Sequence, residues 1–393
     1  MKTSVALADA LEDRFPAGTM SSPLVRPLVV LGNPSPALVE ELRAVAADAL
    51  PGVPKPLVFG AGARACIESG MPCVAIVDGD DDTSEEEALR LRRNPAHATT
   101  PLIGLASSAD EIAFSTNYGC GGDDVVPKGE LHRLLPRVRS LQSASTSSTA
   151  SRERGKAIVA SPDPRRRVVL GRVLHTAGYS IEFAGDAVEA TALAQKHGAK
   201  LVVVDAAEDP AGSLVQVKRS RLNGLVANWV LVVEPRQIAQ LTPLVDPLPY
   251  VALGDAFSPP ENVLFVANEL ARGGGTEGRG SARLLFGSAV HFRVAGRDED
   301  EVGFTYNVSE TGLYVRTLVA PPAKETVWLE LQPPRCDRRV RLEGVVQWRR
   351  PFGPNDQATV PTGFGFEITD GSASDRRRFT EGYKALHAST FGA

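Results

Sequence analysis

Residues 74–78 read VAIVD and residues 201–205 read LVVVD, and each run has the length and composition of a buried strand that ends in an aspartate. Both runs belong to a series of short apolar strands that alternate with amphipathic helices. Such strands are typical of a parallel sheet that is covered by helices on both faces. The sequence therefore predicts two doubly wound α/β domains, at residues 24–142 and 155–271.

The two predicted α/β domains also share a turn. After the first strand, residues 33–36 read NPSP and residues 161–164 read SPDP. This form places a helix-capping residue beside a proline that suits the first helical turn. The repeated turn supports the view that the two domains are copies of one layout.

The pattern changes from Val290 onward, where short strands of alternating polar and apolar residues follow one another. The alternation is clear at Val340, Leu342 and Val346. Together with one helix expected at residues 375–387, these strands predict a small antiparallel β-barrel over residues 283–393.

Two segments lack apolar residues and are predicted to be linkers. Residues 143–154 are rich in Ser and Thr, and residues 272–282 are rich in Gly and Arg. They divide the chain into three pieces of ordinary domain size.

The composition of the whole chain limits its partners. The chain has 393 residues, with 43 Lys and Arg against 47 Asp and Glu, and a formal net charge of -4. No overall positive charge draws it to nucleic acid or anionic lipid, so we expect neither as a partner. The apolar runs are far shorter than the roughly 20 residues of a membrane helix, so we expect no membrane insertion. Asp9, Glu12 and Asp13 interrupt the uncharged core of a secretory signal, which indicates a cytoplasmic protein.

The residue types that carry most enzyme chemistry are dispersed. The four cysteines include no C-x-x-C pair, and the six histidines form no ligand cluster, so we expect no metal site. No His, Cys or carboxylate group has catalytic spacing, and we therefore expect a protein that is not an enzyme.

One pair of arginines, Arg279 and Arg283, is distinguished by its surroundings. The chain contains four R-x-x-x-R pairs, about as many as chance predicts, so the pair alone means little. This pair, however, lies in the Gly-rich linker and leads into a strand. It is followed by Asn307, Ser309 and Gly312 in the form N-x-S-x-x-G.

This combination resembles the PilZ family, whose members bind cyclic di-GMP through R-x-x-x-R followed by (D/N)-x-S-x-x-G. The resemblance covers about residues 276–370 and includes GLYVRT, GVVQWRR and GFGFEITD. It implies that Arg279 and Arg283 hold guanine edges and phosphates, while Asn307, Ser309 and Gly312 form the wall on the barrel side. A guanidinium suits this role because its paired donors match guanine O6 and N7 or phosphate oxygens. A glycine at position 312 would let the backbone turn and approach the ligand closely.

The first α/β copy resembles the receiver domain of two-component signalling, which has a flavodoxin-like fold. The matching segments are VAIVDGD, PLIGLAS and GGDDVVPKG. The resemblance places Asp78 at the phosphoacceptor position and Lys128 at that of the lysine that pairs with the phosphate. The acidic pair after the first strand is absent, because that strand ends in Gly32 and Asn33. Since Mg²⁺ prefers anionic oxygen ligands, we expect poor Mg²⁺ binding.

The second copy departs further from a receiver. Asp205 matches the phosphoacceptor position, but Ser161 and Pro162 replace the acidic pair and Asp255 replaces the lysine. An anionic Asp255 would repel a phosphoaspartate. The resemblance implies degenerate receiver-like domains, or pseudo-receivers, that serve in docking to a protein partner or in homodimerisation.

Three functions remain open from the sequence. The leading hypothesis is a bacterial signalling effector that binds cyclic di-GMP in its PilZ-like barrel and relays that state through protein contacts of the receiver-like domains. The second is a scaffold or adaptor that binds no nucleotide. The third is a response regulator phosphorylated at Asp78, with the barrel as its output. Motility, secreted polysaccharide and development are typical outputs of PilZ effectors, and the sequence does not select among them.

Overall fold

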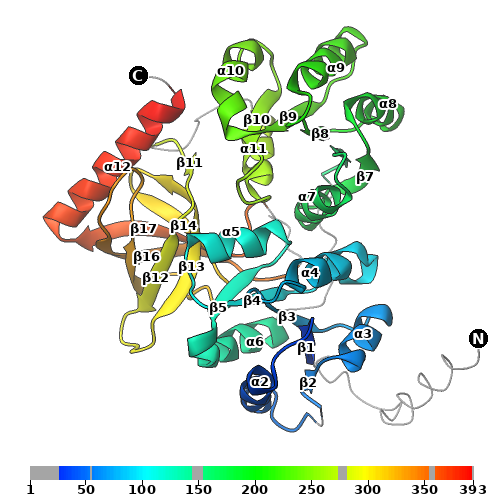
Figure 1. The fold of residues 1–393 in the computed structure, drawn as a ribbon. Helices are drawn as coiled ribbons and strands as arrows, with labels where there is room; N and C mark the ends of the chain where they lie inside the picture. The colour runs from blue at the N-terminus through cyan, green and yellow to red at the C-terminus, as the bar shows by residue number, and fades with distance from the viewer. Residues whose placement is uncertain (1–25, 54, 144–153, 273–280, 354–358, 392–393) are drawn as a thin grey trace, which may run out of the picture.

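The computed structural model describes residues 26–53, 55–143, 154–272, 281–353 and 359–391, which form two α/β domains and a β-barrel with a terminal helix (Figure 1). This architecture confirms the fold class predicted from the sequence. Within the described residues, no helix has the length and apolar character needed to span a membrane.

The first α/β domain has a five-stranded parallel sheet in the order β2-β1-β3-β4-β5, the flavodoxin-like order. Its elements are β1 (Leu28–Leu31), α2 (Pro36–Ala49), β2 (Leu57–Val58), α3 (Ala61–Glu68), β3 (Val74–Asp78), α4 (Ser84–Arg93), β4 (Leu102–Ala106), α5 (Glu111–Gly119), β5 (Asp124–Pro127) and α6 (Leu134–Ser143), with 3-10 turns at Pro95–His97 and Lys128–Arg133. Successive side chains of a strand point to opposite faces. Val30 and Ile76 accordingly pack with α2 and α6, whereas Ala75 and Val77 pack with α3 and α4.

The second α/β domain repeats this topology, with the order β7-β6-β8-β9-β10. Its elements are β6 (Lys156–Ala160), α7 (Pro164–Thr176), β7 (Ser180–Ala184), α8 (Ala187–His197), β8 (Leu201–Asp205), α9 (Pro210–Leu222), β9 (Asn228–Val233), α10 (Pro235–Val245), β10 (Val251–Asp255) and α11 (Asn262–Ala271). One face of the sheet packs on α8, α9 and α10, and the other packs on α7 and α11.

The repeated proline turns start α2 and α7. The Ser35 hydroxyl accepts a hydrogen bond from the Leu38 amide at 3.2 Å, and the Asp163 carboxylate accepts one from the Arg165 amide at 2.8 Å. A proline occupies the first turn of each helix. The predicted combination of cap and proline is therefore confirmed in both copies.

The C-terminal domain is a closed antiparallel barrel. Its elements are β11 (Leu284–Leu285), β12 (Ala289–Val294), β13 (Glu301–Ser309), β14 (Gly312–Arg316), β15 (Thr326–Leu331), β16 (Val340–Arg350), β17 (Gly363–Gly371) and α12 (Ala373–Phe391). The strand order is β13-β12-β15-β16-β17-β14, and pairing of β14 with β13 closes the ring, while β11 adds to β13. Phe379 and Tyr383 of α12 are buried against the barrel core.

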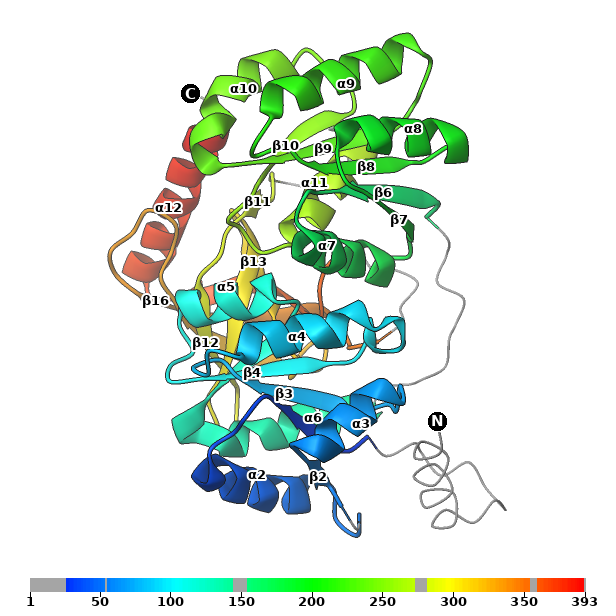
Figure 2. The same cartoon turned by 45° about the vertical axis from the view of Figure 1, so that its right-hand side comes forward.

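The barrel lies beside both α/β domains, with α12 on its outer side (Figure 2). Phe114 and Tyr118 of α5 are buried against Phe304 of β13, with the Phe114 and Phe304 ring centroids 5.3 Å apart. From the second α/β domain, the Phe265 ring of α11 meets Tyr306 of β13 edge-on at 6.1 Å. One strand of the barrel thus contacts both α/β domains.

Candidate functional site

A cavity of about 340 Å³ lies between α11 and the barrel, at the lower end of the size range of small-ligand pockets. Four of its lining side chains come from α11 and the residue that caps it, and the others come from the barrel. The lining residues are Phe265, Asn268, Glu269, Arg272, Arg283, Asn307, Trp348, Arg349, Arg350, Thr359 and Val360.

Two residues that the sequence singled out meet in this cavity. Arg283 lies directly before β11, and Asn307 lies on β13, where a bulge interrupts the pairing with β14. Strand β11 pairs with β13 in a register that sets Leu285 opposite Asn307. The short strand β11 therefore brings the arginine motif beside the N-x-S-x-x-G motif.

The charge of the cavity is strongly positive. Four arginines line it against a single carboxylate, that of Glu269. Arg350 is only 5% exposed, and burial lowers the pKa of its guanidinium. Its terminal nitrogen donates to the Val360 carbonyl, but its Nε has no hydrogen-bond partner among the described residues. A buried N–H in this state can donate a hydrogen bond to an anionic group of a ligand.

Trp348 gives the cavity an aromatic surface. It lies on β16 next to a bulge, and its ring is 5.1 Å from that of Tyr314, tilted by 32°. Because its side chain is still 37% exposed, part of the indole is accessible to a ligand. Aromatic rings are the usual stacking partners of unpaired bases.

The other predicted ligand residues are placed differently. Arg279 lies outside the described residues. Ser309 and Gly312 do not line the cavity: they close the hairpin between β13 and β14, where the Ser309 hydroxyl donates to the Gly312 carbonyl at 3.1 Å. A Cβ on Gly312 would lie 2.2 Å from the Phe366 carbonyl oxygen, so the glycine is required by strand packing. Its φ is not positive, so the left-handed backbone region is not the reason for a glycine here.

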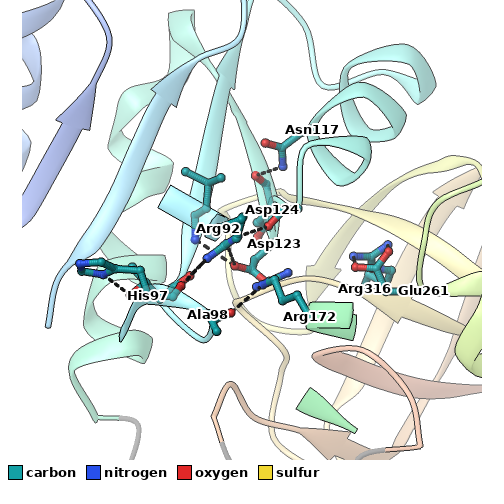
Figure 3. Close-up of polar contacts among 12 residues, drawn as sticks. Arg92, His97, Ala98, Asn117, Asp123, Asp124, Arg172, Glu261 and Arg316 are labelled. Carbon is teal, nitrogen blue, oxygen red and sulfur yellow. Dashed lines mark hydrogen bonds and ion pairs between the residues drawn. The ribbon is translucent and has the colours of Figure 1, made fainter. Parts of the chain in front are cut away.

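The two α/β domains are joined at Asp123, just before β5 (Figure 3). Its carboxylate accepts from Arg92 of its own domain at 3.3 Å and from Arg172 of α7 at 2.6 Å. Arg172 also donates to the Ala98 carbonyl at 3.0 Å. The junction thus consists of one carboxylate held between two arginines of different domains.

The first α/β domain is joined to the barrel by a buried ion pair. Asp124 and Arg137 are both 0% exposed, and Arg137 Nε lies 2.9 Å from Asp124 Oδ2. Arg137 also donates to Glu301 at 2.8 Å and to the Val302 carbonyl at 3.0 Å. The Leu318 amide donates to the Asp124 carboxylate at 3.0 Å. Burial raises the pKa of Asp124, an effect that the neighbouring Arg137 opposes.

All three domains meet at Arg316 of β14, which is also drawn in Figure 3. Its guanidinium bonds both carboxylate oxygens of Glu261, at 2.8 and 3.1 Å, and lies 3.3 Å from the ring centroid of Tyr118. Glu261 precedes α11, and Tyr118 belongs to α5. A bidentate pair that also stacks on a ring is a geometry for which arginine is suited and lysine is not.

At the end of β3, Asp78 and Lys128 lie together as the receiver resemblance implies. Lys128 Nζ is 2.5 Å from Asp78 Oδ1 and 2.9 Å from Asp80 Oδ2. Burial alone would lower the pKa of Lys128, but its hydrogen bonds to the two carboxylates outweigh that effect and raise it. Ser107 donates to Asp80 at 2.7 Å. Within the described residues, no three His, Cys, Asp or Glu side chains form a group that could hold a metal ion.

The corresponding place in the second α/β domain differs. Asp205 is bonded by the Ser161 hydroxyl at 2.8 Å and paired with Arg166 of α7 at 3.2 Å. Asp255 stands at the position of the receiver lysine and has no positive charge to pair with Asp205. Arg166, which was not predicted from the sequence, supplies that charge instead. Asp255 instead accepts from the Phe257 amide at 2.8 Å.

The C-terminal domain belongs to the class of small closed β-barrels that are followed by a helix. It is a PilZ domain, since the family model described as "PilZ domain" matches residues 277–384. No curated protein sequence matches the chain.

Two solved structures show weak similarity. One is the Bacillus subtilis inhibitor of motility (MotI/DgrA), at 18% identity and a TM-score of 0.25, over 29% of this chain and 53% of that one. The other is the PilZ domain of CeSA from a cellulose-synthesising bacterium, at 14% identity and a TM-score of 0.21, over 27% of this chain and 99% of that one. These values are too low to bear on function.

Most residues that line the cavity were not predicted from the sequence. Trp348, Arg349 and Arg350 lie in the segment GVVQWRR, which belongs to the PilZ resemblance but was given no role. Most apolar positions of α11 pack in the core of its own domain, and only the structure shows that Phe265 packs against the barrel instead.

Proposed function

We propose that this chain is a non-enzymatic signalling protein that binds cyclic di-GMP in the cavity between α11 and the barrel. The observation that carries the proposal is that Arg283 and Asn307, from the two halves of the PilZ motif, line one arginine-rich cavity. Cyclic di-GMP carries two phosphates and two guanines. Guanidinium groups pair with phosphate oxygens and with the O6 and N7 edge of guanine, and Trp348 offers a ring for stacking.

The two α/β domains are the proposed output. In this proposal, they act as receiver-like docking modules. Their partner is another protein or a second copy of this chain. The support is their topology together with the charged junctions at Asp123, Asp124 and Arg316, through which a change at the barrel can reach both domains.

Replacing Arg283 by alanine is expected to weaken binding of cyclic di-GMP about 10- to 100-fold, the effect of losing charge-assisted hydrogen bonds. Isothermal titration calorimetry of the full chain measures it, and Arg279→Ala/Arg283→Ala should abolish detectable heat. Arg297→Ala, an exposed arginine in the turn after β12, is the matched control and should bind as the wild type does. If the wild type gives no heat at tens of micromolar ligand, the proposal is wrong and the scaffold hypothesis takes its place.

A second candidate function is phosphorylation at Asp78, which is favoured by the 2.5 Å approach of Lys128. We expect it to be inefficient, because Asp78 lacks the neighbouring acidic pair that would hold Mg²⁺. Incubation with acetyl phosphate and Mg²⁺, followed by intact-mass spectrometry, tests it. A phosphate adduct on the wild type that is absent from Asp78→Asn would establish this function, whereas no adduct on either protein would exclude it under those conditions.

A further inference from the structure

The cavity crosses a domain boundary. Phe265, Asn268, Glu269 and Arg272 line it from the last helix of the second α/β domain, and all four precede the residues that match the PilZ family model, 277–384. The PilZ domain by itself therefore leaves one side of the cavity open.

This side of the cavity is held firmly against the barrel. The Asn268 side-chain amide donates to the Thr359 carbonyl at 2.8 Å, and the Tyr306 hydroxyl donates to the Glu261 carbonyl at 2.9 Å. At the start of α11, the Glu261 carboxylate is paired with Arg316 of the barrel. Contacts at both ends of α11 thus fix its distance from the barrel.

Arg272, the residue that caps α11, is suited to contact a ligand. It is paired with Glu269 at 2.8 Å, and the side chains of Arg272 and Glu269 are 41% and 40% exposed. Exposed ion pairs of this kind contribute little to stability. Arg272 can therefore exchange the Glu269 carboxylate for a phosphate of the ligand at small cost.

The two sides of the cavity complement each other. Arg350, with its unpartnered Nε, belongs to the barrel, and Arg272 belongs to the α/β domain. A ligand with two phosphates offers one anionic group to each side.

We propose that α11 forms the second wall of the ligand site, and that Arg272 binds the ligand together with the arginines of the barrel. This inference rests on the proposed function. Its consequence is that the second α/β domain belongs to the sensor as well as to the output. A ligand that contacts both domains binds more tightly when they are docked, and by linkage it must stabilise their docking.

The test is calorimetric titration of the full chain with cyclic di-GMP. Arg272→Ala is expected to raise the dissociation constant about tenfold, the effect of losing a charged hydrogen bond. Arg219→Ala is the matched control, because Arg219 is also exposed in the last turn of a helix in the same domain but does not line the cavity. It should bind as the wild type does, and circular dichroism should show both variants folded.

Hydrogen exchange gives a second readout that does not depend on a mutation. Saturating ligand should slow the exchange of amides in α11 as well as in β13. If Arg272→Ala binds as the wild type does and exchange slows only in the barrel, the inference is wrong, although the proposed function stands when Arg283→Ala has lost affinity. If the wild type does not bind at all, the proposed function itself fails and this inference with it.

Discussion

Replacing Arg137 by alanine is expected to destabilise the chain by about 3–5 kcal/mol, the range found when one partner of a buried ion pair is removed. Arg137 is fully buried and donates hydrogen bonds to Asp124, to Glu301 and to the Val302 carbonyl. Its loss would leave the Asp124 carboxylate buried without its cation, between the first α/β domain and the barrel. Urea unfolding, followed by tryptophan fluorescence, measures the change.

The control for this prediction is Arg139→Ala, an exposed arginine two residues further along α6. It should change the stability by less than about 1 kcal/mol, as surface pairs do. Arg137→Met/Asp124→Asn should recover part of the loss, because the fully buried Asp124 charge is then removed together with its partner, and only the partly exposed Glu301 carboxylate loses an ion pair. The account of this junction is wrong if Arg137→Ala is as mild as the control.

The second large effect is expected at the point where the three domains meet. Arg316→Ala removes both hydrogen bonds to Glu261 and the stacking on Tyr118, and it leaves the buried Glu261 carboxylate without its partner. We expect a loss of about 3–5 kcal/mol and separation of the second α/β domain from the barrel. Unfolding curves measure the first effect, and the radius of gyration from small-angle X-ray scattering measures the second.

Two further variants sharpen this test. Arg316→Lys keeps the charge but cannot form the bidentate, stacked geometry, so it should recover only part of the stability. Glu208→Ala removes an exposed carboxylate of the same domain as Glu261 and should leave both measurements unchanged. An Arg316→Ala protein with the stability and radius of the wild type would contradict the role of this residue.

The fold could be predicted largely from the sequence, because burial imposes a simple pattern on its strands. VAIVD and LVVVD are covered on both faces and are apolar up to the terminal aspartate. Barrel strands such as β15 alternate because only one side is buried, whereas β13 and β14 are buried along almost their whole length. Two strands gave no comparable signal. Strand β2 has only two residues, and β7 is an edge strand that reads SIEFA and is mostly not buried.

Only those residues of the candidate site that belong to a local sequence motif could be predicted. Arg283 and Asn307 were found because their spacing matched a known pattern, and they share one cavity. Arg137 belongs to another R-x-x-x-R pair that sequence counting treats as chance, yet it is a central charge at a domain junction. No pattern within one segment could reveal this role, because its partners are Asp124 and Glu301, which belong to different domains. The same holds for Arg272, whose place in the cavity depends on the packing of α11 on the barrel.

The central claim is that cyclic di-GMP binds between α11 and the barrel. It is tested most directly by determining the structure of the full chain with the dinucleotide bound. Our account predicts the ligand in the cavity lined by Arg272, Arg283, Asn307 and Arg350, with its phosphates on the arginines. A ligand bound elsewhere on the chain, with this cavity empty, would contradict it.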